Sequence, residues 1–292
     1  MKKMTGAVIV MLSILTGGAR AQQLPAKWEE LTAEDFLKAL QTANNTCALP
    51  FGILEKHGPA GVLGTDLINI RFSTLKATKD EYVIVFPEYY TGQIFEAKHQ
   101  PGTIAYSRHL QLEMLQETVA EMARNGCRKI VIINGHGGNT ALIQYFAQTQ
   151  LESPKDYVVY TLSALGVPQG TPGTAPSRPG VDGHAGEGEV SNLMASRPEL
   201  AHPERSSSES GADLNRLELP EGVYTGIWWY ARFPNHYQGT AAGATAARGQ
   251  ATTDAIATRI ANALRAVKRD QTALRLQNEF FERVAQPPPP RR

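Results

Sequence analysis

Apolar and polar positions follow two patterns along this chain, short β-branched apolar runs and stretches with helical spacing. The apolar runs predict strands at 47–54, 82–86, 129–134 and 157–162. Helical spacing predicts helices at 108–125, at 139–151, from about 184 to 197, and as one or two long Ala-rich helices over 244–284. Strands that alternate with helices are typical of an α/β fold, in which a mostly parallel sheet is covered on both faces.

Segments rich in Gly, Pro and Ser separate these elements without dividing the chain. Residues 166–183 and 205–211 are expected to be surface loops, and 287–292 an extended or disordered Pro/Arg tail. Neither an internal repeat nor a domain linker is recognisable. We therefore expect one domain over 22–286.

The first 21 residues have the layout of a secretory signal peptide. Lys2 and Lys3 precede an apolar stretch at 7–15, and Ala-Arg-Ala at 19–21 forms a small-x-small cleavage site. We expect an exported protein, periplasmic or secreted; the alternative is an uncleaved N-terminal anchor. Cleavage would leave 271 residues and change the formal charge from +1 to −2. Elsewhere the sequence predicts no membrane span.

Composition narrows the possible partners. The 29 Lys and Arg against 28 Asp and Glu provide no dominant basic surface, so a nucleic-acid partner is not expected. Cys47 and Cys127 are the only cysteines. Export would permit a bridge between them, but each adjoins or lies in an apolar run, so we expect two buried, unpaired cysteines.

Three clusters of ligand-type residues follow apolar strands, where ligands bind in open α/β sheets. The first contains Glu55, His57 and Asp66. Residues two apart on an extended backbone point the same way, so Glu55 and His57 can converge, and Gly64 allows the chain to return Asp66 to them. Two carboxylates and an imidazole suit Zn²⁺, Mn²⁺ or Fe²⁺. The alternative is a solvated surface turn.

The second cluster is the glycine-rich stretch 134–139, with His136 at its centre. Glycines on both sides leave the imidazole unshielded and let backbone N–H groups approach a ligand. These groups precede a predicted helix, whose N-terminus suits an anion or a developing oxyanion. The alternative is a glycine-rich turn with an incidental His.

The third cluster places His184, Glu187 and Glu189 within six residues. If a helix begins near His184, Glu187 lies one turn further along and Glu189 faces elsewhere. One ion cannot easily take all three, so we expect one metal ligand and one acid–base or substrate-binding group. Alternatively, the carboxylates favour the positive end of the helix.

The remaining histidines and the aromatic run carry weaker signals. We expect the other histidines at the surface or outside the ligand set: His99, His109, His202 and His236. The aromatic residues 228–230 are expected in core or subunit packing, with the wall of a site for a flat substrate as the alternative.

Taken together, the motifs resemble the creatininase (creatinine amidohydrolase) family. Its members carry Glu-x-His-Gly-Pro and Gly-Thr-Asp, then Asn-Gly-His-Gly-Gly-Asn, then His-Ala-Gly-x-x-Glu-Thr-Ser. The chain has EKHGPAGVLGTD at 55–66, NGHGGN at 134–139 and HAGEGEVS at 184–191. YTG at 90–92 with PGTI at 101–104 is similar to a further stretch of the family.

This resemblance implies a three-layer α/β/α sandwich with a mostly parallel central sheet. It also implies a homo-oligomer, often a hexamer, that hydrolyses C–N bonds with one or two divalent ions per subunit, Zn²⁺ or Mn²⁺, with Fe²⁺ as an alternative. The metal ligands that it implies by motif position are Glu55, His57, Asp66, His136 and Glu189, with Asp66 bridging two ions.

The chain departs from the family around these ligands. Creatininase itself has a Glu two residues after the central His, where this chain has Gly138. The other departures are Lys56 for Gln, 60–62 for His-Leu-Pro, Ile94 and Ala97 for a Ser and a His, and Val190 for Thr. These departures leave the implied ligands intact, but they put the substrate pocket in question.

We therefore expect a metal-dependent hydrolase that acts on a cyclic or other small amide. Metal-activated water would attack the carbonyl carbon, and His184 or Glu187 would pass a proton to the leaving nitrogen. Three alternatives have the same ligands: a formamide or short-peptide hydrolase, an ester hydrolase, and an exported metal- or sugar-binding protein without turnover.

Overall fold

The computed structural model describes residues 24–178 and 180–286. The signal peptide expected at 1–21 and the tail expected at 287–292 lie outside these residues. Across the described segments, every helix is too short or too polar to cross a membrane.

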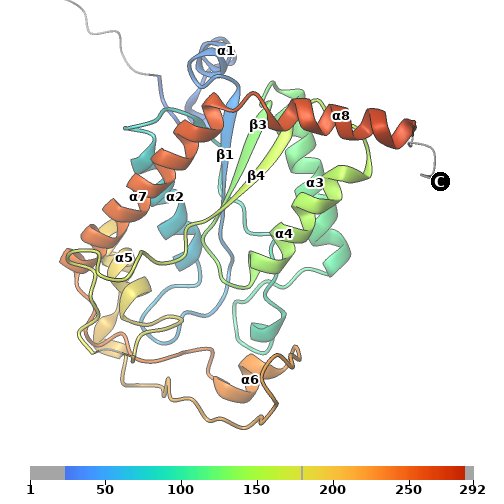
Figure 1. Ribbon diagram of the computed structural model, residues 1–292. Helices are drawn as coiled ribbons and strands as arrows, with labels where there is room; N and C mark the ends of the chain where they lie inside the picture. Colours follow the sequence, from blue (N-terminus) through green and yellow to red (C-terminus); the bar gives the residue numbers. More distant parts are fainter. Residues whose placement is uncertain (1–23, 179, 287–292) are drawn as a thin grey trace, which may run out of the picture.

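Four parallel strands form the central sheet, in the order β2-β1-β3-β4 (Figure 1). Their bounds are Thr46–Phe51 for β1, Ile84–Val85 for β2, Lys129–Asn134 for β3 and Val158–Ser163 for β4. β1 and β3 pair from Thr46 and Lys129 to Phe51 and Asn134, so their carboxyl ends meet at one edge. The parallel sheet expected from the alternating pattern is confirmed.

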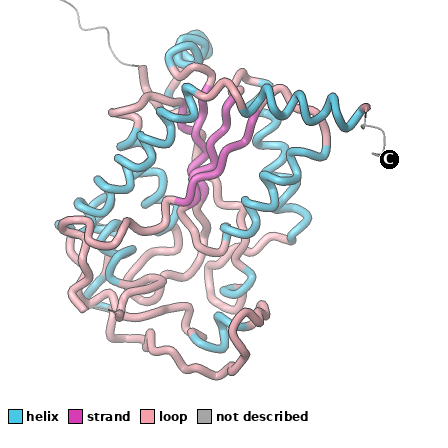
Figure 2. Tube along the Cα trace, viewed as in Figure 1, coloured by secondary structure: helices cyan, strands magenta, loops and turns pink. Residues whose placement is uncertain are grey.

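Helices cover both faces of this sheet. α2 and α7 lie on one face, with α5 packed against them, and α3 and α4 lie on the other (Figures 1 and 2). The bounds are Ala33–Thr42 for α1, Thr65–Ala77 for α2, Arg108–Arg124 for α3, Asn139–Thr149 for α4, Glu187–Ser196 for α5, Trp228–Arg232 for α6, Ala246–Arg269 for α7 and Ala273–Ala285 for α8. Short 3₁₀ helices lie at Trp28–Glu30, Phe95–Ala97, Gln150–Glu152, Pro198–Leu200 and Pro203–Arg205. The α/β/α layers are confirmed.

Two apolar clusters fasten these layers. Cys47 and Leu49 of β1 pack on the side of α3 and α4, whereas Ala48 between them packs on the side of α2 and α7. This alternation follows from the strand, whose successive side chains point to opposite faces of the sheet. Ile260 and Leu264 of α7 are fully buried against the second face.

Some predicted elements appear where expected and others do not. β3 matches its prediction, and α3 starts after Ser107, whose Oγ accepts a bond from the N–H of Leu110 (3.4 Å). The strand predicted at 82–86 keeps only two residues. Three helices, α1, α2 and α6, had no prediction, and α2 lies directly beside the candidate site.

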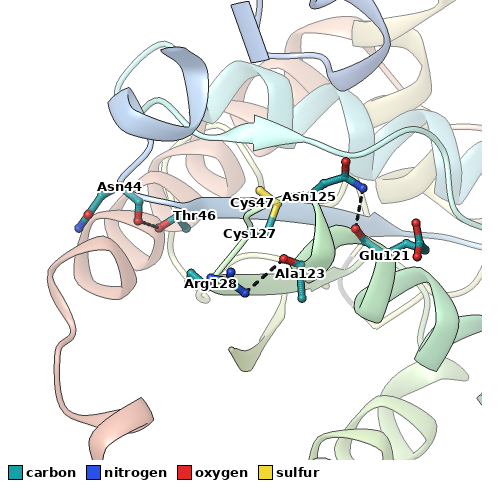
Figure 3. Close-up of a disulfide and its surroundings, with 8 residues drawn as sticks. All are labelled: Asn44, Thr46, Cys47, Glu121, Ala123, Asn125, Cys127 and Arg128. Atoms are coloured by element: carbon teal, nitrogen blue, oxygen red, sulfur yellow. Dashed lines mark hydrogen bonds between the residues drawn. A yellow bond between two sulfur atoms is a disulfide. The ribbon is translucent and has the colours of Figure 1, made fainter. Parts of the chain in front are cut away.

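A disulfide joins Cys47 to Cys127, with Cα atoms 5.7 Å apart (Figure 3). The expectation of two unpaired cysteines is therefore wrong. Both cysteines are fully buried, as expected, but the pairing of β1 with β3 also brings them together. Cys47 lies near the start of β1 and Cys127 just before β3, so the bridge ties these strands at the end opposite to Phe51 and Asn134.

Candidate metal centre

The three sequence clusters meet at the carboxyl edge of the sheet. The segment after β1 carries Glu55 and His57, and the first turn of α2 carries Asp66. His136 follows β3, and Glu189 lies in the first turn of α5. The fold brings all five implied metal ligands together, and we call them the carboxylate–histidine cluster.

Asp66 lies at the middle of this cluster. Its Oδ1 is 3.1 Å from His57 Nε2, and its Oδ2 is 3.0 Å from His136 Nδ1. Glu55 Oε1 lies 2.9 Å from the same His136 nitrogen, and Glu189 Oε2 lies 3.7 Å from His57 Nε2. Each Asp66 oxygen therefore faces a histidine nitrogen that also lies near a second carboxylate.

Backbone carbonyls orient the histidines. His57 Nδ1 lies 3.2 Å from the carbonyl oxygen of Glu55, and His136 Nε2 lies 3.0 Å from that of Gln93. A carbonyl can only accept, so these nitrogens carry the protons and donate. The other ring nitrogen of each neutral histidine then directs a lone pair into the cluster, as metal-ligating histidines do.

This arrangement fits a divalent cation. With His136 neutral, its Nδ1 lone pair meets Glu55 Oε1 and Asp66 Oδ2, which are buried and accept no hydrogen bond from the described residues. Buried acceptors without donors are costly, and a cation would satisfy all three. Glu55, His57 and Asp66 present ligand atoms close enough to share one ion, as do His57, His184 and Glu189. Imidazole and carboxylate ligands suit Zn²⁺ and Mn²⁺.

In the metal-free chain, the raised pKa values of two histidines also indicate that the carboxylates of the cluster favour a nearby positive charge. Burial disfavours the charged form of His57, but the nearby Asp66 and other carboxylates outweigh it and raise the pKa of His57 to about 10. The pKa of His136 is raised well above its ordinary value in the same way, mainly by Glu55 against the effect of burial. Without metal, protons on these rings balance the carboxylates.

Glu187, expected as an acid–base group, lies outside the cluster. Its carboxylate accepts bonds from the backbone N–H (2.9 Å) and hydroxyl (2.6 Å) of Ser177 and lies 3.0 Å from Arg248 Nη1. Arg248 also donates to Asp182 (2.7 Å), which in turn accepts from the N–H of Gly188. We call Arg248, Asp182, Glu187 and Ser177 the Arg248 network. The network engages both oxygens of Glu187, which does not line the cavity, so the expected acid–base role of Glu187 is wrong.

His236 joins the site although the sequence placed it outside the direct ligands. It is 2% exposed, and its Nε2 contacts Glu55 Oε2. Its Nδ1 accepts a bond from the indole N–H of Trp229 (2.8 Å). Burial lowers the pKa of His236 despite the contact with Glu55. No spacing rule connects residue 236 to the three motifs, so only the folded chain reveals this contact.

A cavity of about 1240 Å³ opens onto the cluster. His184 lies on its wall, with Nε2 donating to the carbonyl of Lys56 (3.0 Å) and Nδ1 3.8 Å from Glu189 Oε2. Aromatic residues also line the cavity, among them Tyr224 and residues 228–230, and the Trp229 ring lies 5.8 Å from that of His184. The site-lining alternative for this aromatic run is therefore confirmed. The departures Ala60, Ile94 and Ala97 are fully buried and line no part of the cavity.

Gly138 has no room for a side chain. Its backbone is right-handed helical, but a Cβ there would lie 2.5 Å from His136 Nε2 and 2.9 Å from the Gln93 carbonyl oxygen. These are the two atoms whose hydrogen bond orients His136. Asn139 secures the same region by accepting from the N–H of Gln93 (2.9 Å) and donating to the carbonyl of Gly52 (3.2 Å).

Comparison with known proteins agrees with this geometry. The chain is 26% identical over 119 residues to a creatinine amidohydrolase of Pseudomonas putida, a match that spans 39% of this chain and 46% of that relative. Its structure is similar to a creatininase mutant of the Zn–Zn type (TM-score 0.69, 20% identity, 85% of this chain and all of that one). It is also similar to a creatininase with Mn (TM-score 0.67, 20% identity, the same coverage).

The family comparison extends beyond the matched segment. The creatinine amidohydrolase (Creatininase) family profile matches residues 29–264, which include every strand, the carboxylate–histidine cluster and most of α7. The three ordered motifs of the sequence lie within this range. The chain therefore belongs to the creatininase family.

Proposed function

We propose that this protein is a metal-dependent hydrolase of an amide bond in a small substrate, with cyclic amides as the first class to test. One observation carries the proposal: with His136 neutral, three acceptor atoms on Glu55, Asp66 and His136 face one another without a donor. When bound there, a divalent ion would polarise a carbonyl group and lower the pKa of water.

Asp66 would bridge two ions, since each of its oxygens faces a different histidine. Glu55 and His136 would complete one ligand set, and His57 with Glu189 the other. Glu55, His57, Asp66 and His136 are buried on a preformed framework of strand ends and helix starts, which limits their movement, and Glu189 is partly exposed.

His184 is the residue best placed to move a proton. Its Nε2–H is held by the Lys56 carbonyl, so Nδ1 is free to give a proton to, or take one from, a group in the cavity. Gly137 and Gly138 line the cavity at the start of α4, where backbone N–H groups suit a developing negative charge. Trp228 and Trp229 offer flat apolar surfaces for the remainder of the substrate.

The test combines metal analysis with product detection. Purified protein, stripped and reloaded with Zn²⁺ or Mn²⁺, should release amine or ammonia from at least one member of a panel of lactams, formamides and short peptides. His184→Ala should reduce this rate by on the order of 10²–10⁴ while metal content stays unchanged. Bound metal without product from any amide, or product only from esters, would contradict the proposal.

We also infer that the protein works after export, as the N-terminal sequence predicts. The disulfide supports this location, because such bridges persist mainly in oxidising compartments. Fractionation of cells followed by mass measurement of the mature chain would test both export and cleavage. The homo-oligomer implied by the family stays a prediction, for which light scattering in solution is the direct test.

A further inference from the structure

His236 contacts the one oxygen of Glu55 that faces away from His136. Glu55 Oε1 lies beside His136, whereas Oε2 is in contact with His236 Nε2. His236 holds a left-handed backbone conformation, with φ of 51°. Non-glycine residues adopt this region at an energetic cost and usually where the surroundings require it. Here it accompanies a buried ring aimed at a candidate metal ligand.

The partner of the other ring nitrogen fixes the tautomer of His236. An indole has an N–H group and no acceptor, so Trp229 can only donate to His236 Nδ1. Nδ1 must therefore carry a lone pair, so the ring holds a single proton, on Nε2. That proton is donated to Glu55 Oε2, which gives a chain of two bonds from Trp229 through His236 to Glu55.

This orientation distinguishes His236 from the cluster histidines. His57 and His136 each give their proton to a backbone carbonyl and direct a lone pair toward the carboxylates. His236 does the opposite and directs an N–H group toward them. Glu55, His184 and His236 lie close enough together to suggest an ion. However, a metal on His236 Nε2 would require a proton on Nδ1, directly against the indole N–H.

We propose that His236 is a positioning residue for Glu55, that Trp229 sets its tautomer, and that His236 does not ligate metal. The inference rests on the proposed metal site. The Nε2–H group of His236 holds Glu55 Oε2 in place and leaves Glu55 Oε1 to face Asp66 and His136. Hydrogen bonds of this kind to a ligating carboxylate strengthen metal binding.

The experiment measures Zn²⁺ affinity by competition with a chromophoric chelator. His236→Ala should bind Zn²⁺ about 10–100-fold more weakly than wild type. Trp229→Phe, which keeps the ring and removes only the N–H, should show a smaller loss of about tenfold or less. His236→Gln should recover most of the affinity, because its amide N–H₂ can reach the same carboxylate oxygen. Histidine-selective ¹⁵N NMR of the Zn²⁺-loaded wild type should report a proton on His236 Nε2.

Two controls match these variants. Trp28→Phe alters an indole outside the cavity that packs against Phe36 and Phe86, and His109→Ala removes an exposed histidine paired with Glu113, so both should keep wild-type Zn²⁺ affinity. Wild-type affinity in His236→Ala, no recovery in His236→Gln, or a proton on His236 Nδ1 would each overturn the inference. Metal binding without amide hydrolysis in the wild type would contradict only the proposed function, so the two failures are distinguishable.

Discussion

The carboxylate–histidine cluster and the Arg248 network are two groups of charges that each contain a buried glutamate and lie on neighbouring parts of the chain. Both include a carboxylate from the first turn of α5, Glu189 in the cluster and Glu187 in the network. In the network, Arg248 supplies a positive charge, and Ser177 and backbone N–H groups satisfy the remaining oxygens. In the cluster, two buried oxygens accept no hydrogen bond from the described residues.

The difference lies in the source of the counter-charge. The Arg248 network carries its own cation, which pairs with both of its carboxylates, and this is what a structural role needs. The cluster contains histidines whose free lone pairs add acceptors, so its counter-charge must come from protons or from a metal ion. Two glutamates separated by a single glycine thus belong to sites of opposite purpose.

Removal of the Asp66 carboxylate should have the largest effect, because it weakens metal binding in the cluster and leaves the Arg248 network intact. Asp66→Asn takes one charge from both ligand sets, so Zn²⁺ affinity and amide hydrolysis should each fall by more than about 100-fold. Metal content after dialysis provides the measurement. Glu187→Gln is the matched control, since it removes a carboxylate of the network and should keep its metal. Full metal content in Asp66→Asn would refute the ligand assignment.

Removal of the network's own cation should instead damage stability. Arg248→Met leaves Glu187 buried without its partner and should lower the free energy of unfolding by about 3 kcal/mol, as expected when a buried pair is broken. Urea denaturation of the metal-free protein would measure this. Adding Glu187→Gln to the same chain should restore part of the loss. A change in the free energy of unfolding below about 1 kcal/mol, typical of a surface pair, would show that Arg248 and Glu187 do not form a buried ion pair.

Proton competition should make the cluster sensitive to pH. The pKa of His57 is about 10 in the metal-free fold, above its ordinary value of 6.5, because Asp66 and other carboxylates outweigh burial. The resulting stability is fully present below about pH 6.5 and is lost as pH rises through about 10. Metal must displace such protons, so Zn²⁺ affinity should rise between about pH 6 and 8, by up to about tenfold per pH unit for each proton released. Affinity that is flat or falling over this range would contradict the assignment.

The smallest effect is expected where an ion pair lies near the surface. Lys56 pairs with Glu209 at 2.5 Å, and its side chain is 17% exposed against 33% for the glutamate. Glu209→Gln should therefore change the free energy of unfolding by less than about 1 kcal/mol. Thermal denaturation would measure the change. If Glu209→Gln lowered the free energy of unfolding as much as Arg248→Met, the pair near the surface and the buried pair would not differ in strength.

Sequence patterns predicted the strands and glycine-rich turns better than the helix that carries Asp66. β3 and the turn after it were predictable because a β-branched run ends in glycines. The sequence did not predict α2, because this helix is packed between the sheet, α5 and α7, and its buried positions include Ser73 and Thr74 as well as apolar residues. A helix buried on more than one side shows no clear apolar stripe.

In the candidate site, some residues could also be predicted from local motifs and others could not. The five implied ligands lie in three local motifs, so each motif could be recognised by itself and the parallel sheet brought them together. His236 reaches Glu55 from far along the chain, and Cys47 meets Cys127 through strand pairing. Contacts of this kind depend on tertiary structure, which has no signature in local spacing.

The crowded position of Gly138 also bears on how this chain is related to creatininase itself, which has a glutamate two residues after the central histidine. A Cβ at residue 138 would collide with His136 Nε2 and the Gln93 carbonyl, the pair that aims His136. A single Gly138→Glu change would therefore add a carboxylate while disturbing an existing ligand. A glutamate at residue 138 requires the segment around Gln93 to move as well. The two forms of the site therefore differ by more than one substitution.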